Sequence, residues 1–534
     1  MTPFRDYFVA TVFTLAVFAW QCISPVSASP LKQTPRSQLL KGVESRHSDL
    51  KTIFQADLAR LSEEATAQNV TGLVEEISRL QAVLASVETV YTRPPRDVEA
   101  SLPLTMPEQE RALRVKYQTL RNEYSKALYK QAEMTLKGNL ASVSYVMLLE
   151  IVRVSPDHAD ARRILGYELY RQKWVTPFER RMIDDNLIDD PRFGWIHKDD
   201  VDRYHSGERR YASNIPGFAG KGKWLAEDRD NELRRDFRYA WEVRTANFLV
   251  KTNHSLEKGV EISRALEDFH EYFRFLFAGF YTTPQQIQAL FRGGQSGRAL
   301  PSSQLYVVHY YANKDEYVRT LINKIPMVAQ TNGIYMQDDK IAYFYHDPND
   351  ASLAPMYHEA THQLFYESQQ KPRKPGNLAH FWIIEGIACY MESFERSTDG
   401  QSFSTGNPNY VRFVNARQNL AVRNVFLPFE MMDQMGQNVY QQATLPVLQQ
   451  RYSQSTGMAH FFMHYNEGEY RDALVNHISQ LYSSMPRVAE NPDTLDRLTE
   501  TSFGDLDQAY RSYCLELDRQ LALDEAIPRP THAQ

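Results

Sequence analysis

Two histidines and a glutamate share one short segment, MYHEATHQLF. It reads His358, Glu359, Ala360, Thr361, His362, with no Pro or Gly to break a helix. Side chains four residues apart on a helix lie on one face, so both imidazoles can bind one metal ion while Glu359 flanks its open side. This spacing is typical of metal-dependent hydrolases, in which the glutamate acts on a water molecule.

A carboxylate further along the chain completes the predicted site. A catalytic zinc ion usually has three protein ligands, so two histidines require another donor. The segment WIIEGIA places Glu385 in an otherwise apolar run, and a carboxylate is seldom buried without a partner or a metal. We therefore predict that His358, His362 and Glu385 bind Zn²⁺ and that Glu359 is the general base. The alternative is a pair of surface histidines that contact Glu359 on an ordinary helix.

The two motifs HEATHQ and WIIEGIACYME resemble those of the gluzincins, the thermolysin-like and aminopeptidase-like zinc peptidases whose third ligand is a Glu on a second helix. The closest resemblance is to exported bacterial proteins with a peptidase-like domain of unknown function. It covers roughly residues 241–521. The resemblance implies the same three ligands, the same role for Glu359, and hydrolysis of peptide bonds in a peptide or protein substrate.

Further site residues are implied by the same resemblance. The segment Ile341–Tyr345 would be the edge strand along which an extended substrate pairs. In the thermolysin pattern a carboxylate one turn beyond the third ligand supports a zinc-bound histidine, but Cys389 stands there in this chain. Glu392 is the alternative support.

A donor that stabilises the negative charge of the tetrahedral intermediate is also required. Tyr452 is the candidate catalytic residue, because it opens an expected helix in the lobe after the ligands, where related peptidases often supply a Tyr or His. His460 and His464 compete for this role. The alternative for Tyr452 is an ordinary core or surface hydroxyl.

Length and composition set the broad class. With 534 residues, of which 43% are apolar, the chain is long enough for two or three domains. A formal charge of -6 gives no basic field, so we expect no nucleic-acid partner. Cys389 and Cys514 follow the leader described next, and we favour buried thiols over a single disulfide.

The first residues have the layout of a secretory signal. Arg5 precedes an apolar run, and the small residues that follow predict cleavage after Ala28. An uncleaved anchor is the alternative, but the run is shorter than the roughly 20 residues that a spanning helix needs. We expect a secreted or periplasmic protein with no stable membrane insertion after cleavage of the signal peptide, residues 1–28.

The remaining chain predicts an α+β fold in three parts. Helical periodicity and a Pro-rich break indicate an N-terminal helical arm over residues 37–172. Within it, residues 141–170 resemble one tetratricopeptide-type hairpin, with an ordinary helical hairpin as an equal alternative. Residues 173–240 form an irregular or small β-rich connection, and residues 241–525 a gluzincin-like catalytic domain with a small sheet and a helical lobe.

Two other functions fit the same residues. The chain could be a catalytically inactive peptidase-like envelope protein whose helical arm binds a protein partner. It could also be a zinc hydrolase that acts on a non-peptide amide or on cell-wall peptide, because the metal chemistry would be the same.

Overall fold

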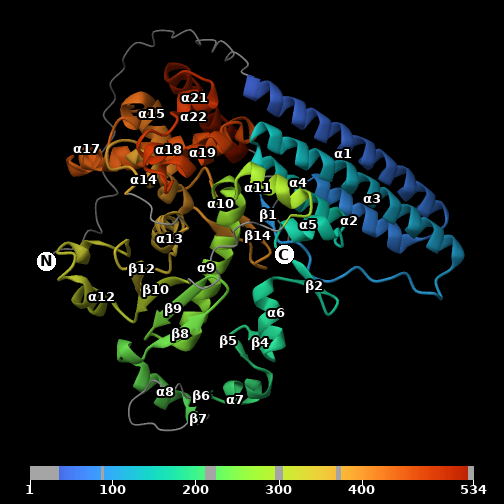
Figure 1. Ribbon diagram of the computed structural model, residues 1–534, viewed down its shortest axis with the longest axis horizontal. Helices are drawn as coiled ribbons and strands as arrows, with labels where there is room; N and C mark the ends of the chain where they lie inside the picture. Colours follow the sequence, from blue (N-terminus) through green and yellow to red (C-terminus); the bar gives the residue numbers. More distant parts are fainter. Residues whose placement is uncertain (1–34, 86–89, 211–223, 295–304, 369–373, 527–534) are drawn as a thin grey trace. The chain divides into compact units, whose positions relative to one another are not determined.

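The computed structural model describes residues 35–85, 90–210, 224–294, 305–368 and 374–526. The predicted signal peptide lies outside these residues. The described chain is an α+β protein, as predicted (Figure 1). Residues from Gln33 onward form one compact unit that includes both the arm and the predicted catalytic domain. Among the described helices, none has the length and apolar character to cross a membrane.

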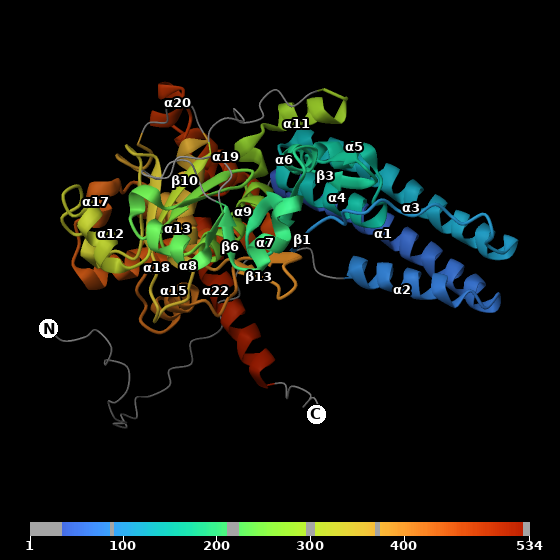
Figure 2. The same ribbon diagram turned by 90° about the horizontal axis from the view of Figure 1, so that it is seen from below.

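Long amphipathic helices form the arm. Its helices are α1 (Pro35–Ala67), α2 (Thr71–Ala85), α3 (Glu108–Thr135), α4 (Ala141–Val154) and α5 (Ala159–Ile164). Figure 2 shows α1, α2 and α3 side by side. Phe54, Leu58, Leu61 and Ala65 of α1 repeat at helical spacing and are all buried in the core that these helices share.

Of the two alternatives for residues 141–170, an ordinary pair of contacting helices forms, and the expected end of its second helix is wrong. Its second helix was expected to reach residue 170, but α5 ends at Ile164. Gly166 follows with φ +88°, a conformation that glycine adopts without strain, and the chain turns into a hairpin of β2 (Glu168–Tyr170) and β3 (Lys173–Val175). The helix α4 packs against α3 and α5 and also contacts α10 and α19 of the later chain.

The connection after the arm is a series of small hairpins and short helices. Its elements are α6 (Pro177–Asp184), β4 (Leu187–Asp190), β5 (Gly194–His197), α7 (Val201–His205), β6 (Glu208–Arg210), β7 (Trp224–Ala226) and α8 (Glu227–Arg234). Strands β4 and β5 pair antiparallel, as do β6 and β7. Of the two forms expected for residues 173–240, the described part is therefore the small β-rich one.

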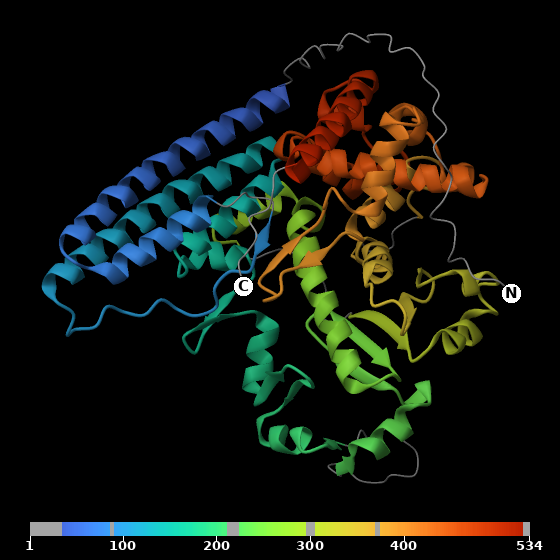
Figure 3. The ribbon, with the colours of Figure 1, turned by 180° about the vertical axis from the view of Figure 1, so that it is seen from behind.

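One five-stranded sheet supports the predicted site. Its strands are β8 (Trp241–Arg244), β9 (Phe248–Thr252), β10 (Tyr306–Tyr311), β11 (Ile334–Met336) and β12 (Ile341–Tyr345), in the order β11-β12-β10-β9-β8. The central β10 is parallel to β9 and β12, and both outer strands are antiparallel to their neighbours. The helices between these strands are α9 (Leu256–Leu276), α10 (Ala278–Tyr281), α11 (Pro284–Phe291) and α12 (Lys314–Leu321), and α9 runs along the sheet (Figure 3).

The prediction that Ile341–Tyr345 is the edge strand is wrong. This segment is β12, which lies between β10 and β11. The edge strand next to it is β11, whose three residues are too few to give an alternating pattern in the sequence.

A helical lobe follows the sheet. Its elements are α13 (Ala354–Glu367), α14 (Phe381–Met391), β13 (Glu395–Arg396), β14 (Ser402–Ser404), α15 (Val411–Ala421), α16 (Phe429–Asp433), α17 (Gln437–Gln441), α18 (Leu445–His464), α19 (Arg471–Leu481), α20 (Pro486–Glu490), α21 (Leu495–Thr499) and α22 (Phe503–Ala526). Strand β14 pairs with β1 (Tyr91–Thr92), which follows the arm's second helix. The arm is thus joined to the lobe by backbone hydrogen bonds.

Candidate metal centre

Two helices bring the predicted ligands together. On α13, Met356, Tyr357, Ala360 and Leu364 are buried at helical spacing, and this helix contacts β10, β11, β12 and α14. The opposite face of the same turns carries the two histidines of the motif. Helix α14 is almost wholly apolar and packs most extensively against α18, so its one carboxylate, Glu385, is directed between helices.

The three predicted ligands meet. The Nε2 atoms of His358 and His362 lie 3.2 Å apart. Oε2 of Glu385 lies 3.6 Å from Nε2 of His358 and 4.0 Å from Nε2 of His362. The side chains are 15%, 18% and 12% exposed for His358, His362 and Glu385, so the group is sheltered but open on one side.

The spacing of these atoms fits a zinc ion. Ligands about 2.0–2.2 Å from a tetrahedral zinc lie about 3.3 Å from one another. The three measured separations are within a few tenths of an ångström of that value or slightly longer, so small side-chain movements would complete the coordination. Two imidazoles and one carboxylate are also the donor set of gluzincin-type catalytic sites.

Glu392 supports His358 in the place that the sequence assigned to it as an alternative. Its Oε1 lies 2.8 Å from Nδ1 of His358. The carboxylate also accepts hydrogen bonds from Tyr410 and Arg412. Cys389 lies close by, with Sγ 3.9 Å from the same Nδ1. Among the described residues Cys389 and Cys514 are both buried free thiols, as predicted.

The electrostatics of the group reflect its crowded charges. Burial alone would lower the pKa of His358, but contacts with Cys389, Glu385 and Glu392 raise it well above its usual value. Burial lowers the pKa of His362. Burial would raise the pKa of Glu392, yet its bonds to His358 and Arg412 lower it to about 2. Carboxylates therefore surround the two rings, an environment that favours a cation.

Glu359 faces the edge of the sheet. Its Oε2 accepts a hydrogen bond of 2.8 Å from the backbone N–H of Tyr335 on β11. In an antiparallel pair, alternate residues point both backbone groups to the same side. The N–H of Tyr335 points away from β12, so its carbonyl faces the same open side. The predicted general base and the exposed backbone of the edge strand therefore lie together.

Of the three candidates for the oxyanion donor, only Tyr452 lies near the ligands. Burial raises its pKa, and the Glu385 carboxylate adds to this rise. Its ring also packs edge-on against Tyr440. In His460, Nε2 lies 3.0 Å from the Gly406 carbonyl oxygen and Nδ1 lies 2.8 Å from the Tyr513 hydroxyl.

His464 is bonded elsewhere as well, with Nε2 2.8 Å from the Tyr390 hydroxyl.

Sequence reasoning missed two contributors to the site, Arg412 and the backbone of Tyr335. Arg412 lies on a different helix from the carboxylate that it binds, and no local pattern marks this contact. The backbone donor of Tyr335 has no side-chain signature at all.

The comparisons with known proteins add one finding. A family model described as "Protein of unknown function (DUF1570)" matches residues 352–486. The matched region contains all three predicted ligands, Glu359, Glu392 and Tyr452. No curated protein matches the chain.

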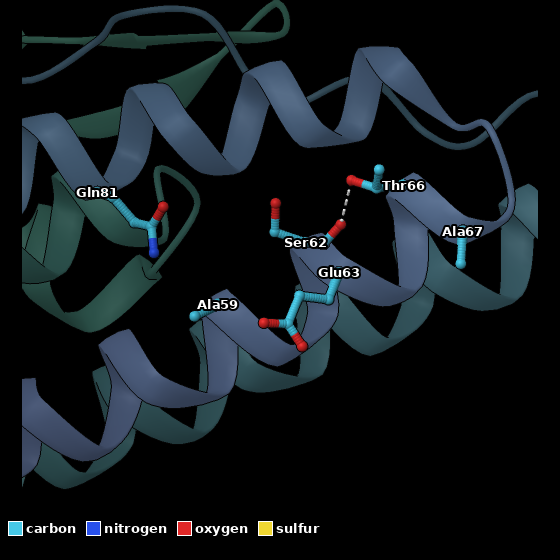
Figure 4. Close-up of a pocket in the computed structure, with 6 residues that line it drawn as sticks. All are labelled: Ala59, Ser62, Glu63, Thr66, Ala67 and Gln81. Atoms are coloured by element: carbon cyan, nitrogen blue, oxygen red, sulfur yellow. Dashed lines mark hydrogen bonds between the residues drawn. The ribbon is translucent and has the colours of Figure 1, made fainter.

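A hollow on the arm is of a different kind. It lies between α1 and α2 and is lined by Ala59, Ser62, Glu63, Thr66, Ala67 and Gln81 (Figure 4). Thr66 donates its hydroxyl proton to the Ser62 carbonyl oxygen within α1. Its lining includes one carboxylate and no histidine or cysteine, which does not make a set of metal ligands.

Proposed function

We propose that the chain is a zinc-dependent hydrolase of peptide bonds, with His358, His362 and Glu385 as ligands. The observation that carries this proposal is that three donor side chains from two helices lie close together, with Glu359 of the same motif bonded to the edge strand beside them. A bound zinc ion would supply Lewis acidity and lower the pKa of a water molecule to about 7.

The chain's own residues would perform the proton transfers. Glu359 takes the proton of the attacking water and returns it to the leaving amine. Glu392 keeps His358 in the tautomer whose Nε2 lone pair faces the other ligands. Tyr452 donates its hydroxyl proton in a hydrogen bond to the developing oxyanion.

The edge strand suggests how a substrate binds. The outward carbonyl of Tyr335 can accept a hydrogen bond from an extended peptide that lies along the sheet edge, while its N–H is bonded to Glu359. The peptide would then run past Glu359, which accepts a bond from the same residue. An extended peptide or protein is accordingly the substrate class that this arrangement favours, in a secreted or periplasmic setting as the leader indicates.

A mixed peptide library, with and without a chelator, tests the proposal. We expect cleavage by the zinc-loaded chain, its loss with the chelator and its return with Zn²⁺. Glu359→Gln should keep zinc while hydrolysis falls by at least about 100-fold, and His362→Asn should lose the ion itself. A folded chain that takes up no zinc, or one that holds zinc at these ligands and cleaves no peptide, would contradict it.

A second candidate function, binding of a protein partner by the arm, is favoured by an apolar groove between α1 and α3. Its lining includes Leu39, Val43, Leu50, Ile53 and Met134, and Ile53 is 60% exposed. In this case Ile53→Asp would abolish partner capture while Glu359→Gln would not. If Ile53→Asp still captured the partner, or if the wild type captured none, the peptidase proposal would be the only candidate function left.

A further inference from the structure

A second group of metal-binding side chains lies at the start of α14. His380, Asp433 and His477 each offer one ligand atom, and these atoms lie within 4.8 Å of one another. They belong to the residue before α14, the end of α16 and the middle of α19. The two imidazole rings have centroids 4.8 Å apart. None of these residues belongs to the candidate metal centre described above.

One ring nitrogen of His477 is buried without a hydrogen bond to any described residue. The residue is fully buried, and its Nδ1 lies 2.6 Å from the carbonyl oxygen of Asp493. A carbonyl only accepts, so Nδ1 carries the proton and Nε2 carries the lone pair. This Nε2 is buried and has no hydrogen-bond partner among the described residues. Burying such an atom without a partner is unfavourable, and a bound ion is one of the few arrangements that would satisfy it.

His380 and Asp433 lie close together. Nδ1 of His380 lies 2.8 Å from Oδ1 of Asp433. Trp382 donates its indole N–H to the same Oδ1 at 3.2 Å. A bound cation would take the place of the proton between Nδ1 and Oδ1, so that this nitrogen and the Asp433 carboxylate would both be ligands.

Backbone hydrogen bonds fix His380 next to Asp433. His380 adopts a left-handed conformation, with φ 62° and ψ 18°. Its N–H donates to the Asp433 carbonyl at 2.7 Å, and the next N–H, from Phe381, donates to the Met435 carbonyl at 3.1 Å. An ion bound here would tie the N-terminus of α14 to α16 and α19. Glu385 lies five residues later on that helix.

We propose that His380, Asp433 and His477 bind a second divalent cation of the zinc class, with a structural role. Two imidazoles and a carboxylate are donors that zinc accepts at about 2.0–2.2 Å, and one water would complete four ligands. The ion would fix α14 and so position Glu385. The second site does not depend on peptidase activity.

Counting metal ions in the full chain tests this proposal. After equilibration with Zn²⁺ and removal of excess, we expect two equivalents in the wild type. His477→Asn retains a donor for the Asp493 carbonyl but lacks Nε2, so one equivalent should remain. His380→Asn removes another of the proposed ligands and should give the same count. Asparagine tolerates the left-handed backbone at this position, so we expect the variant to fold. It also serves if the first variant fails to fold. Combining His477→Asn with His362→Asn should leave none.

His460→Asn is the matched control, since His460 is buried in the same lobe but has bonds at both nitrogens. It should retain two equivalents. A wild type with one equivalent that His362→Asn removes and His477→Asn keeps would overturn the second site. A wild type with one equivalent that His477→Asn removes and His362→Asn keeps would support the second site and contradict the catalytic one. Two equivalents that neither His380→Asn nor His477→Asn reduces would also overturn it.

Discussion

Nδ1 of His358 lies 2.8 Å from Oε1 of Glu392, which follows the last residue of α14. The carboxylate can only accept this hydrogen bond, so the proton is on Nδ1 and the Nε2 lone pair is free for a metal. Arg412 donates to both oxygens of the same carboxylate at 2.7 and 2.8 Å. Glu392 is therefore held in place by a group that is not itself a ligand.

We predict that Glu392→Gln weakens zinc binding by about 10–100-fold, the usual effect of removing the carboxylate behind a metal-bound histidine. Competition with a chromophoric chelator measures this affinity. Glu395→Gln, which changes an exposed carboxylate three residues later, is the control and should leave the affinity unchanged. Equal affinities for the wild type and Glu392→Gln would show that Glu392 does not support the ligand.

A second prediction concerns the edge strand. Tyr335→Pro removes the N–H that donates to Glu359. The sheet should tolerate this change, since proline is accepted on edge strands where the N–H faces outward. We expect kcat/KM to fall at least about 10-fold while the zinc content stays the same.

Tyr335→Phe is the matched variant for this position, because it keeps the N–H and removes only the hydroxyl that bonds Glu367. Its kcat/KM should stay within about threefold of the wild type. If the two variants lose activity equally, the side chain rather than the backbone donor is responsible.

The HExxH ligands were predictable because a helix imposes its own spacing. A helix has about 3.6 residues per turn, so His358 and His362, four apart, lie on one face whatever the surrounding fold. Glu385 was marked by its apolar neighbours. Contacts between distant segments gave no such signal. Nothing near Arg412 indicates that it binds Glu392, and nothing near His477 indicates that it faces His380.

The strands show the same division. Ile341–Tyr345 was recognised as a strand from its β-branched and aromatic residues, with the bounds that the structure gives. Its place in the sheet was wrong, because an edge position depends on which other segments pair with it. Three residues of β11 cover its outer side. The length of α5 was likewise set by Gly166, whose effect a helical periodicity does not include.

Glu367 should make the free energy of unfolding depend on pH. Burial raises the pKa of this carboxyl to about 7 from an ordinary value of 4.5, although Gln363 and Tyr335 hydrogen bond to it. The folded chain therefore favours the protonated form. Its contribution to stability is complete below pH 4.5 and is lost as the pH rises through 7.

Glu367→Gln should accordingly raise the free energy of unfolding at pH 8 by about 1–3 kcal/mol and change it little at pH 4. Glutamine can accept the same two hydrogen bonds through its amide oxygen. Urea unfolding at the two pH values measures the effect, with Glu63→Gln on the exposed face of α1 as the control. An equal shift at both pH values would contradict the assignment.

Tyr452 is tested by removing one oxygen atom. Tyr452→Phe should lower kcat by about 10–100-fold with little change in KM or zinc content, because the donor would act on charge that develops only in the transition state. Tyr440→Phe, whose hydroxyl already bonds Ser455, is the neighbouring control. A larger loss in Tyr440→Phe than in Tyr452→Phe would show that the wrong tyrosine was chosen.

The residue after Glu385 sets how closely α14 approaches α18. A Cβ atom on Gly386 would lie 2.6 Å from the carbonyl oxygen of Ser455, a backbone atom that cannot rotate away. Gly386→Ala should therefore push the helices apart, lower the free energy of unfolding by about 1–3 kcal/mol and weaken zinc binding through the displaced Glu385. Gly504→Ala, in the exposed first turn of α22, meets no atom closer than 4.0 Å and should raise stability by about 0.5–1 kcal/mol. Urea unfolding and zinc competition on both variants separate the two effects, and a Gly386→Ala chain with unchanged zinc affinity would mean that the position of Glu385 does not depend on this contact.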